Sequence, residues 1–367
     1  MASSTAPEDD LDFHPRHTSI LLGQDAAEAE LRRAWDSGRM PHAWLLAGPR
    51  GIGKSTLAYR FARAVLASTN GGALFGGGGS AELPAEVAAD HLVFRRVAGQ
   101  AHSDLCTVET GVTDKGVARE QIVVGDARAA VTFFAHTSAE GGWRVAIIDA
   151  ADELNEESAN ALLKVVEEPP EKGLVLLVAH RPAFVLPTIR SRCRILRMKP
   201  LGPGDVARVL SLQWPELAVD DVGALMAMAE GSPGRAIALA QADGVGFYRD
   251  LLDWLGALPK MDVPLMHKIA DRLARRELGR GFRAVATLPE WGLIRAIRAG
   301  AGFHPDHEVV PGEVEVLSRL VGPGNLDHWV RVWEKVSLLL ARGIALNLER
   351  KQLGLVVLST LGRAARG

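Results

Sequence analysis

Cysteine is scarce in this sequence, and so are long apolar runs. Only two cysteines occur among 367 residues, Cys106 and Cys193. Their number and wide separation argue against a disulfide scaffold and fit a reducing cytoplasm. No run of about 18 apolar residues appears, so we expect no membrane span and no membrane partner. Met1 to Arg16 lack a basic start followed by an apolar core, so we expect no secretory signal and predict a cytoplasmic protein.

The sequence also lacks an excess of charge of one sign. The formal net charge is −2, which excludes a strongly basic footprint over the whole protein. Any contact with nucleic acid must therefore be local or shared with partners. Apolar residues make up 47% of the chain and charged residues 23%, which suits ordinary globular cores. The length is sufficient for two or three domains.

Short apolar runs alternate with helical patterns in the first half of the chain. The runs are typical of buried parallel strands, and we expect these strands at 43–47, 144–149 and 174–179. We expect helices at 26–37, 54–67, 121–134 and 156–168. Asn155 is positioned to cap the last of these helices, and Pro169-Pro170 stops it. This order predicts an α/β fold with a parallel sheet covered by helices on both faces.

Strand signals fade from about Pro200. Short helices are expected at 205–211, 220–229 and 234–241, and helical patterns continue to the end of the chain. Trp329, Val332, Trp333, Val336 and Leu340 recur at helical spacing, which indicates packing anchors rather than base-stacking platforms. Six glycines between Gly71 and Gly79 predict a surface loop. The predicted domains are a mobile tail at 1–17, a nucleotide-binding domain at 18–200, a small helical domain at 201–244 and a C-terminal helical domain at 245–367.

A phosphate-binding loop lies between the first predicted strand and the helix that follows it. Residues 48–55 fit the pattern G-x-x-x-x-G-K-[ST] in full. Glycines in such a loop let backbone amides approach a phosphate, and the helix N-terminus adds a positive dipole end. Lys54 would reach the β- and γ-phosphates, and Ser55 would ligate Mg²⁺. The residues assigned to nucleotide are Gly48, Gly51, Gly53, Lys54, Ser55 and Thr56; the alternative is a glycine-rich turn without a ligand.

A carboxylate at the end of the second predicted strand has no acidic residue directly after it. From the strand end Asp149 could hold Mg²⁺, often through water; the alternative is a capping or turn aspartate. Ala150 follows it and cannot position or deprotonate an attacking water. We expect Asp152 and Glu153 to face solvent or to cap the next helix. Loss of general-base assistance typically costs about 10²–10⁴ in rate, so weak or absent hydrolysis is predicted.

Two further motifs carry a resemblance to a known family. They are the run from Ser158 to Pro170, ending Glu-Glu-Pro-Pro, and the run from Leu186 to Cys193, ending Ser-Arg-Cys. Together they resemble the clamp-loader branch of AAA+ proteins, over roughly residues 18–245. The Asp-Ala-Ala sequence from Asp149 is similar to the delta-prime subunits of that branch, because the ATP-hydrolysing gamma/tau subunits have Asp-Glu there. The C-terminal part matches more loosely, through Leu346 to Lys351.

The resemblance implies an architecture, partners and a catalytic role in trans. An AAA+ domain would be followed by a helical lid and by a collar that holds subunits in a ring. The implied partners are gamma/tau and delta subunits, with the sliding clamp and primed DNA reached through the complex. Arg192 is implied to reach a neighbour's ATP as an arginine finger. The alternative is a surface arginine, with Arg190 and Arg194 as equal candidates. Cys193 is interpreted as a small buried residue, not a nucleophile.

Cofactor expectations follow from the same comparison with the family. ATP or ADP with Mg²⁺ is predicted as a possible ligand. Many relatives carry a four-cysteine zinc module, but here Cys106, His91 and His102 are the only soft ligands in that region, so no zinc is expected. Residues 231–235 resemble a second-sensor motif, but Gly234 stands where the hydrolysing subunits have arginine. Arg235, one place later, would contact nucleotide; a helix-start role is the alternative. A basic cluster is interpreted as a solvated helix face rather than a DNA contact, and comprises Arg272, Arg275, Arg276, Arg280 and Arg283.

Three functions remain open from the sequence. The first is a stator subunit of the DNA polymerase III clamp loader, with little or no ATPase of its own, acting within a DNA-polymerising holoenzyme. The second is a gamma/tau-like subunit that itself hydrolyses ATP with Lys54 and Asp149. The third is a P-loop kinase, which the Ser-Arg-Cys triplet and the lack of a visible acceptor site weaken. Ala150 favours the first.

Overall fold

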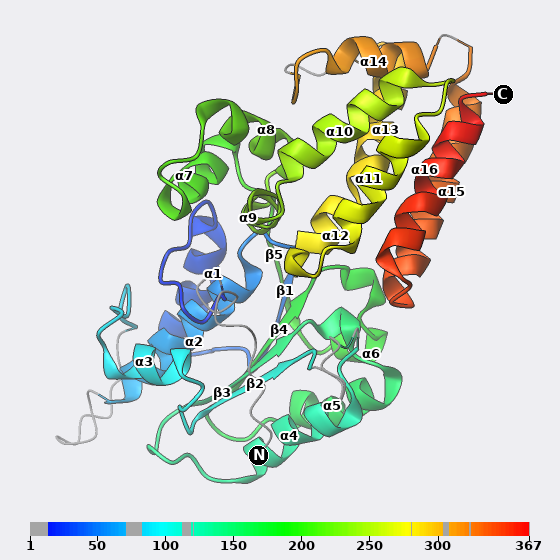
Figure 1. Ribbon diagram of the computed structural model, residues 1–367. Helices are drawn as coiled ribbons and strands as arrows, with labels where there is room; N and C mark the ends of the chain where they lie inside the picture. The colour runs from blue at the N-terminus through cyan, green and yellow to red at the C-terminus, as the bar shows by residue number, and fades with distance from the viewer. Residues whose placement is uncertain are drawn as a thin grey trace. The chain divides into compact units, whose positions relative to one another are not determined.

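A computed structural model describes residues 14–70, 83–111, 119, 121–279, 281–303, 308–322 and 324–366. The chain divides into two compact units, residues 1–202 and 203–367, each of which is drawn in Figure 1. The predicted glycine loop at 71–79 and most of the predicted tail lie outside the described residues. The lid and collar domains expected at 201–244 and 245–367 both fall in the second unit, and their separation stays a prediction.

The first unit is built on a five-stranded sheet in the order β2-β3-β4-β1-β5, with every neighbouring pair parallel. Its strands are β1 (Ala43–Ala47), β2 (Leu105–Glu109), β3 (Arg144–Asp149), β4 (Gly173–Ala179) and β5 (Arg194–Arg197). Its helices are α1 (Asp25–Asp36), α2 (Lys54–Asn70), α3 (Leu92–Ala98), α4 (Val124–Ala135), α5 (Glu156–Glu167) and α6 (Pro187–Arg190), with 3-10 turns η2 (Ala151–Glu153) and η3 (Pro182–Phe184).

Helices cover both faces of this sheet, as the continuous apolar strands require. Figure 1 shows α1 to α3 on one side and α4 to α6 on the other. Every residue of β1 and β4 is buried. The core on the second side packs α4 and α5 against β1, β3 and β4, through Ile148, Leu162 and Leu177 among others. The predicted α/β class with a parallel sheet is confirmed.

The boundaries of the predicted elements agree best where the local signals are strongest. Residues 43–47 and 144–149 form strands at the expected positions. Helix α5 spans 156–167 instead of 156–168, and Asn155 caps it by accepting a hydrogen bond from the Ser158 amide at 2.8 Å. Helix α4 begins at Val124, three residues later than expected. Strands β2 and β5 and helix α3 were not predicted.

The second unit is helical throughout its described residues. Its helices are α7 (Pro203–Gln213), α8 (Val219–Ala229), α9 (Pro233–Gln241), α10 (Gly244–Ala257), α11 (Val263–Ala274), α12 (Gly281–Ala286), α13 (Leu288–Gly300), α14 (Glu313–Leu320), α15 (Leu326–Ala345) and α16 (Arg350–Ala364), with a 3-10 turn η4 (Arg276–Leu278). Trp329, Val332 and Val336 are buried along α15, as their helical spacing predicted. No described helix combines the length and the apolar character needed to cross a bilayer.

Candidate nucleotide site

The phosphate-binding loop joins β1 to α2. Its glycines lie where backbone conformation or a close contact disfavours a side chain. Gly51 and Gly53 have φ angles of 78° and 96°, which side chains rarely tolerate. A Cβ on Gly48 would lie 2.5 Å from the Met198 carbonyl oxygen. The buried Gln24 supports the loop, because its amide donates to the Ile52 carbonyl at 3.0 Å and to the Lys199 carbonyl at 2.9 Å. The hydrogen bonds of Gln24 and the close contact with Met198 therefore hold the loop in its conformation.

Lys54 lies inside this loop. Its side chain is 2% exposed, and its ammonium donates to the Gly48 carbonyl at 2.8 Å and to the Pro49 carbonyl. Burial lowers the pKa of Lys54 to about 8, although the nearby Asp149 charge opposes this shift. At neutral pH the ammonium stays charged, and the two carbonyls that accept its hydrogen bonds are neutral. An anionic phosphate would satisfy it better than these carbonyls do.

The two predicted magnesium ligands lie together. The Ser55 hydroxyl donates to the Asp149 carboxylate at 2.5 Å. Burial raises the pKa of Asp149, while the Ser55 hydrogen bond lowers it and the charge of Glu109 raises it further. A divalent cation here would relieve the burial of that negative charge. Hard oxygen donors beside a phosphate loop are the donor set that Mg²⁺ prefers, and Thr56 follows, half-buried, in the same turn.

The residues after Asp149 do not behave as the sequence suggested. Ala150 is 1% exposed and offers no polar group. Asp152 was expected to face solvent or cap a helix, but its buried carboxylate accepts from the His180 and Arg181 amides at 2.8 and 3.0 Å. Glu153 forms an ion pair with Arg50 of the phosphate loop. The expectation for both residues was wrong, because η2 directs their side chains back toward β4 and the loop.

Arg192 lies at the surface between α6 and β5. Its guanidinium pairs with Glu167 at 2.8 Å and donates to the Thr188 carbonyl at 3.0 Å. Glu167 belongs to the Glu-Glu-Pro-Pro motif, so the fold brings the two family-like motifs into contact. Of the alternatives, Arg190 is half-buried and donates to the Pro182 carbonyl, and Arg194 pairs with Glu30. Arg192 and Arg194 are the exposed members of the three.

Arg235 belongs to the second unit, at the start of α9. Two of its guanidinium nitrogens, Nε and Nη2, are buried without a hydrogen-bond partner in the part of the chain that the structure describes. Burial lowers the pKa of Arg235, and the charges of Glu230 and Glu290 oppose this. Its role toward nucleotide stays a prediction.

Two polar residues near Asp149 were missed by the sequence reasoning. Glu109 ends β2, directly beside Asp149 in the sheet register. Tyr59 on α2 donates to Glu109 at 2.8 Å. Neither carries a motif signal, but prediction of β2 as a strand would have placed Glu109 at the same sheet edge as Asp149.

The soft ligands considered for zinc have other positions. His91 caps α3 through the Val93 amide, and the His102 ring accepts from the Asp104 amide at 3.2 Å. Among the described residues, no group of three or more His, Cys, Asp or Glu side chains is arranged to hold a metal. The expectation of no zinc stays a prediction.

We expect both cysteines to be poor nucleophiles. Burial raises the pKa of Cys106 to about 11 and that of Cys193 to about 12. At pH 8 the thiolate fraction should be roughly 10⁻³ or less, about a hundredfold below that of an ordinary cysteine. Iodoacetamide labelling followed by mass spectrometry should show correspondingly slow alkylation. Urea-unfolded protein serves as the control, and equal rates in folded and unfolded protein would contradict the burial argument.

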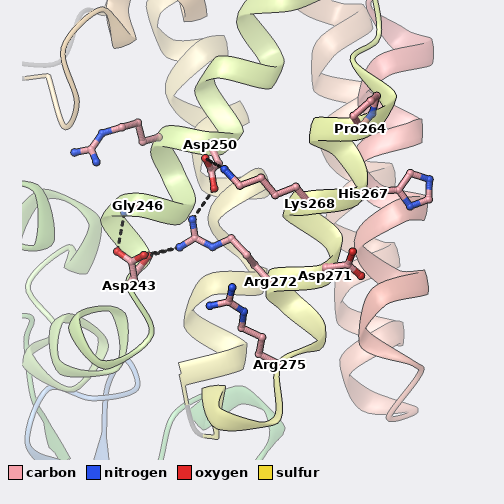
Figure 2. Close-up of a pocket in the computed structure, with 10 residues that line it drawn as sticks. Asp243, Gly246, Asp250, Pro264, His267, Lys268, Asp271, Arg272 and Arg275 are labelled. Atoms are coloured by element: carbon pink, nitrogen blue, oxygen red, sulfur yellow. Dashed lines mark hydrogen bonds and ion pairs between the residues drawn. The ribbon is translucent and has the colours of Figure 1, made fainter.

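A charged cavity of about 640 Å³ lies in the second unit, and none of the predicted site residues lines it. Figure 2 shows Asp250 between Lys268 and Arg272 on the facing helices α10 and α11. Arg272 is 15% exposed and pairs with both Asp243 and Asp250. The expectation of a solvated basic face is therefore wrong for Arg272. Arg275 and Arg283 are exposed, whereas Arg280 and the Arg276 side chain lie outside the described part.

The fold and the site define a class. A parallel sheet with a complete phosphate loop after β1, a helix that begins at the end of that loop and an aspartate at the end of β3 make the first unit a P-loop domain.

Comparisons with known proteins show which family the first unit resembles. The family model described as "DNA polymerase III, delta subunit" matches residues 23–202. The delta-prime subunit of DNA polymerase III from Pseudomonas aeruginosa is 35% identical over 197 residues, which cover 52% of this chain and 53% of that protein. The gamma/tau subunit from Mycobacterium tuberculosis is 28% identical over 287 residues, covering 76% of this chain and 46% of that protein. Over residues 23–202 the chain is similar to this DNA polymerase III subunit family.

The chain spans about half the length of these curated relatives. Among solved structures, a gamma subunit-related protein from Thermotoga maritima aligns with 93% of this chain, at 16% identity and a TM-score of 0.41.

Proposed function

We propose that this chain is a delta-prime-type stator of a DNA polymerase III clamp loader. It binds nucleotide as a structural ligand and donates Arg192 to the ATP site of a neighbouring subunit. The observation that carries the proposal is the combination of a complete phosphate loop with the buried Ala150 after Asp149. Such a site can hold a nucleotide, but it lacks the acidic residue after the aspartate that would activate water.

Nucleotide would be held by the loop and by Lys54. Backbone amides of Gly51 and Gly53 would face the phosphates, and Lys54 would exchange its carbonyl partners for phosphate oxygens. Mg²⁺ would be held by Ser55, Asp149 and phosphate oxygens, and it would neutralise phosphate charge. Arg235, whose buried guanidinium nitrogens lack partners among the described residues, is proposed as a further nucleotide contact.

Arg192 would act on a second subunit. Its side chain is 42% exposed and is held by a similarly exposed carboxylate, that of Glu167. An exposed ion pair contributes only about 0–1 kcal/mol, so a neighbour's γ-phosphate can replace Glu167 at little cost. A guanidinium placed there would stabilise charge that develops during phosphoryl transfer.

The proposed partners are gamma/tau-type and delta-type subunits, with the sliding clamp and primed DNA reached through the complex. The family match and the delta-prime relatives support this assignment. The helical second unit would supply the contacts that hold the ring.

A gamma/tau-like ATPase is the second candidate, and one observation favours it. Gamma/tau relatives match 76% of this chain, a longer stretch than the 52% matched by the Pseudomonas aeruginosa delta-prime relative. As such an ATPase, this chain would use Lys54 and Asp149 for its own turnover. Ala150 argues against this candidate.

Lys54→Ala tests the nucleotide site directly. Removal of a charged hydrogen-bond donor from a phosphate costs about 1.5–3 kcal/mol, so we expect Mg-ADP to bind about 10–150-fold more weakly. Titration of a fluorescent ADP analogue measures this, with the exposed Lys164→Ala on α5 as the control.

The same preparation tests hydrolysis. We expect wild-type turnover far below the ordinary enzyme range of about 1–10 s⁻¹. Turnover within that range, lost in the Lys54→Ala variant, would refute the stator and support the gamma/tau-like ATPase.

A further inference from the structure

Two strand ends place their carboxylates side by side at the nucleotide site. Strands β2 and β3 run parallel, and Glu109 is the register partner of Asp149. Side chains at paired positions of parallel strands leave the same face of the sheet. Glu109 therefore lies beside Asp149, on the face that α2 covers.

Helix α2 contacts both carboxylates, one helical turn apart. Ser55 donates to Asp149 at 2.5 Å, and Tyr59, four residues later, donates to Glu109 at 2.8 Å. His14 lies 3.3 Å from the other Glu109 oxygen. These contacts fix the position of Glu109 while its side chain remains 31% exposed.

The pair of carboxylates is electrostatically unfavourable without a cation. Glu109 and Asp149 are register partners on neighbouring strands, and like charges this close repel each other in a partly buried site. Mg²⁺ between the loop and these strand ends would stabilise both charges.

We propose that Glu109 is a positioning residue for the magnesium ion of this site, holding a water of the metal's coordination shell from the neighbouring strand. Contact through water follows from the geometry. Tyr59 and His14 already hold the Glu109 carboxylate, whereas Ser55 donates to the Asp149 carboxylate, so a water would join Glu109 to a metal at Ser55. Mg²⁺ usually keeps several waters in protein sites. Ala150 offers no such carboxylate on β3, so β2 supplies it.

The proposal rests on the nucleotide binding of the proposed function. It differs from a purely structural role, in which Glu109 only anchors Tyr59 and the segment at His14. The two roles separate when nucleotide affinity is measured with and without metal. A structural defect weakens binding in both conditions, whereas loss of a metal contact weakens only binding with Mg²⁺.

The test is Glu109→Gln in the full chain, because glutamine keeps an oxygen acceptor for Tyr59. Dissociation constants for ADP are measured with excess Mg²⁺ and with EDTA, and melting temperature reports folding. Loss of a residue that supports a metal's ligands typically costs about 10–100-fold in metal affinity. We expect the gain in ADP affinity on adding Mg²⁺ to fall about tenfold or more, with EDTA values and melting temperature unchanged. Glu140→Gln, which removes a partly buried carboxylate paired with Arg96 at 2.7 Å beyond the other end of β2, is the matched control and should keep the wild-type gain.

Three results would overturn the proposal: an unchanged Mg²⁺ gain in Glu109→Gln, an equal loss of affinity with Mg²⁺ and with EDTA, or no Mg²⁺ gain in the wild type. None of these results bears on Arg192, whose test uses a neighbour's ATP site. Failure of the Glu109 proposal is therefore distinguishable from failure of the stator assignment.

Discussion

Replacement of Arg192 by alanine is expected to slow ATP hydrolysis at the adjacent subunit's site by about 10³–10⁵-fold, the range known for arginine fingers. The side chain is exposed and its ion-pair partner is the partly exposed Glu167. Its loss should therefore leave the folding of this chain nearly unchanged. Single-turnover hydrolysis by the reconstituted complex, with the neighbouring subunit as the only hydrolysis-competent copy, measures the effect.

Arg194→Ala is the matched control for this prediction. Arg194 is also exposed and also pairs with a glutamate, Glu30, at 3.0 Å. It follows Arg192 by two residues, so both variants perturb the same surface. If Arg194→Ala slows hydrolysis as strongly and Arg192→Ala does not, the finger assignment moves to Arg194.

Glu313→Ala is expected to destabilise the second unit by about 3–5 kcal/mol, because it removes the carboxylate from a buried ion pair. Glu313 is fully buried at the start of α14. Its carboxylate accepts two hydrogen bonds from Arg295 at 2.6 and 2.8 Å, one from the Tyr248 hydroxyl at 2.7 Å and one from the Val309 amide at 2.7 Å. Alanine would leave these donors buried without that acceptor.

Calorimetric unfolding measures the effect of Glu313→Ala. For a unit of this size, about 1 kcal/mol corresponds to a shift of about 2–4 °C, so the transition should fall by roughly 10 °C. Glu315→Ala, which removes an exposed carboxylate from the same helix, should change the midpoint little. Equal shifts of the midpoint in the two variants would show that the buried hydrogen bonds of Glu313 add no stability beyond that of an exposed glutamate.

The sequence was informative where local pattern and burial agree. Strands β1 and β3 are continuous apolar runs, and they formed at the predicted residues. Strand β2 is different: most of its residues are only half-buried, and Leu-Cys-Thr-Val-Glu shows neither a continuous apolar run nor a clear alternation. Because β2 was missed, Glu109 could not be placed beside Asp149.

The nucleotide site, like the sheet, was predicted only where a local sequence pattern exists. The phosphate-loop motif placed Lys54 and Ser55 on the correct element, because its spacing encodes a strand, a loop and a helix. The apolar run at 144–149 placed Asp149 at a strand end. Side-chain direction after Asp149 is set by the short turn η2, which has no sequence signal, so Asp152 and Glu153 were placed wrongly. The contact of Arg192 with Glu167 joins residues from separate motifs and depends on the tertiary fold.

In the proposed function, this chain's own site does not hydrolyse ATP, whereas its arginine serves a neighbour. ATPase of the reconstituted complex, stimulated by clamp and primed DNA, tests it with Lys54→Ala and Arg192→Ala compared in parallel. The stator assignment predicts that Lys54→Ala retains most of the activity and that Arg192→Ala abolishes the contribution of the adjacent site. Loss of activity in Lys54→Ala with full activity in Arg192→Ala would contradict it.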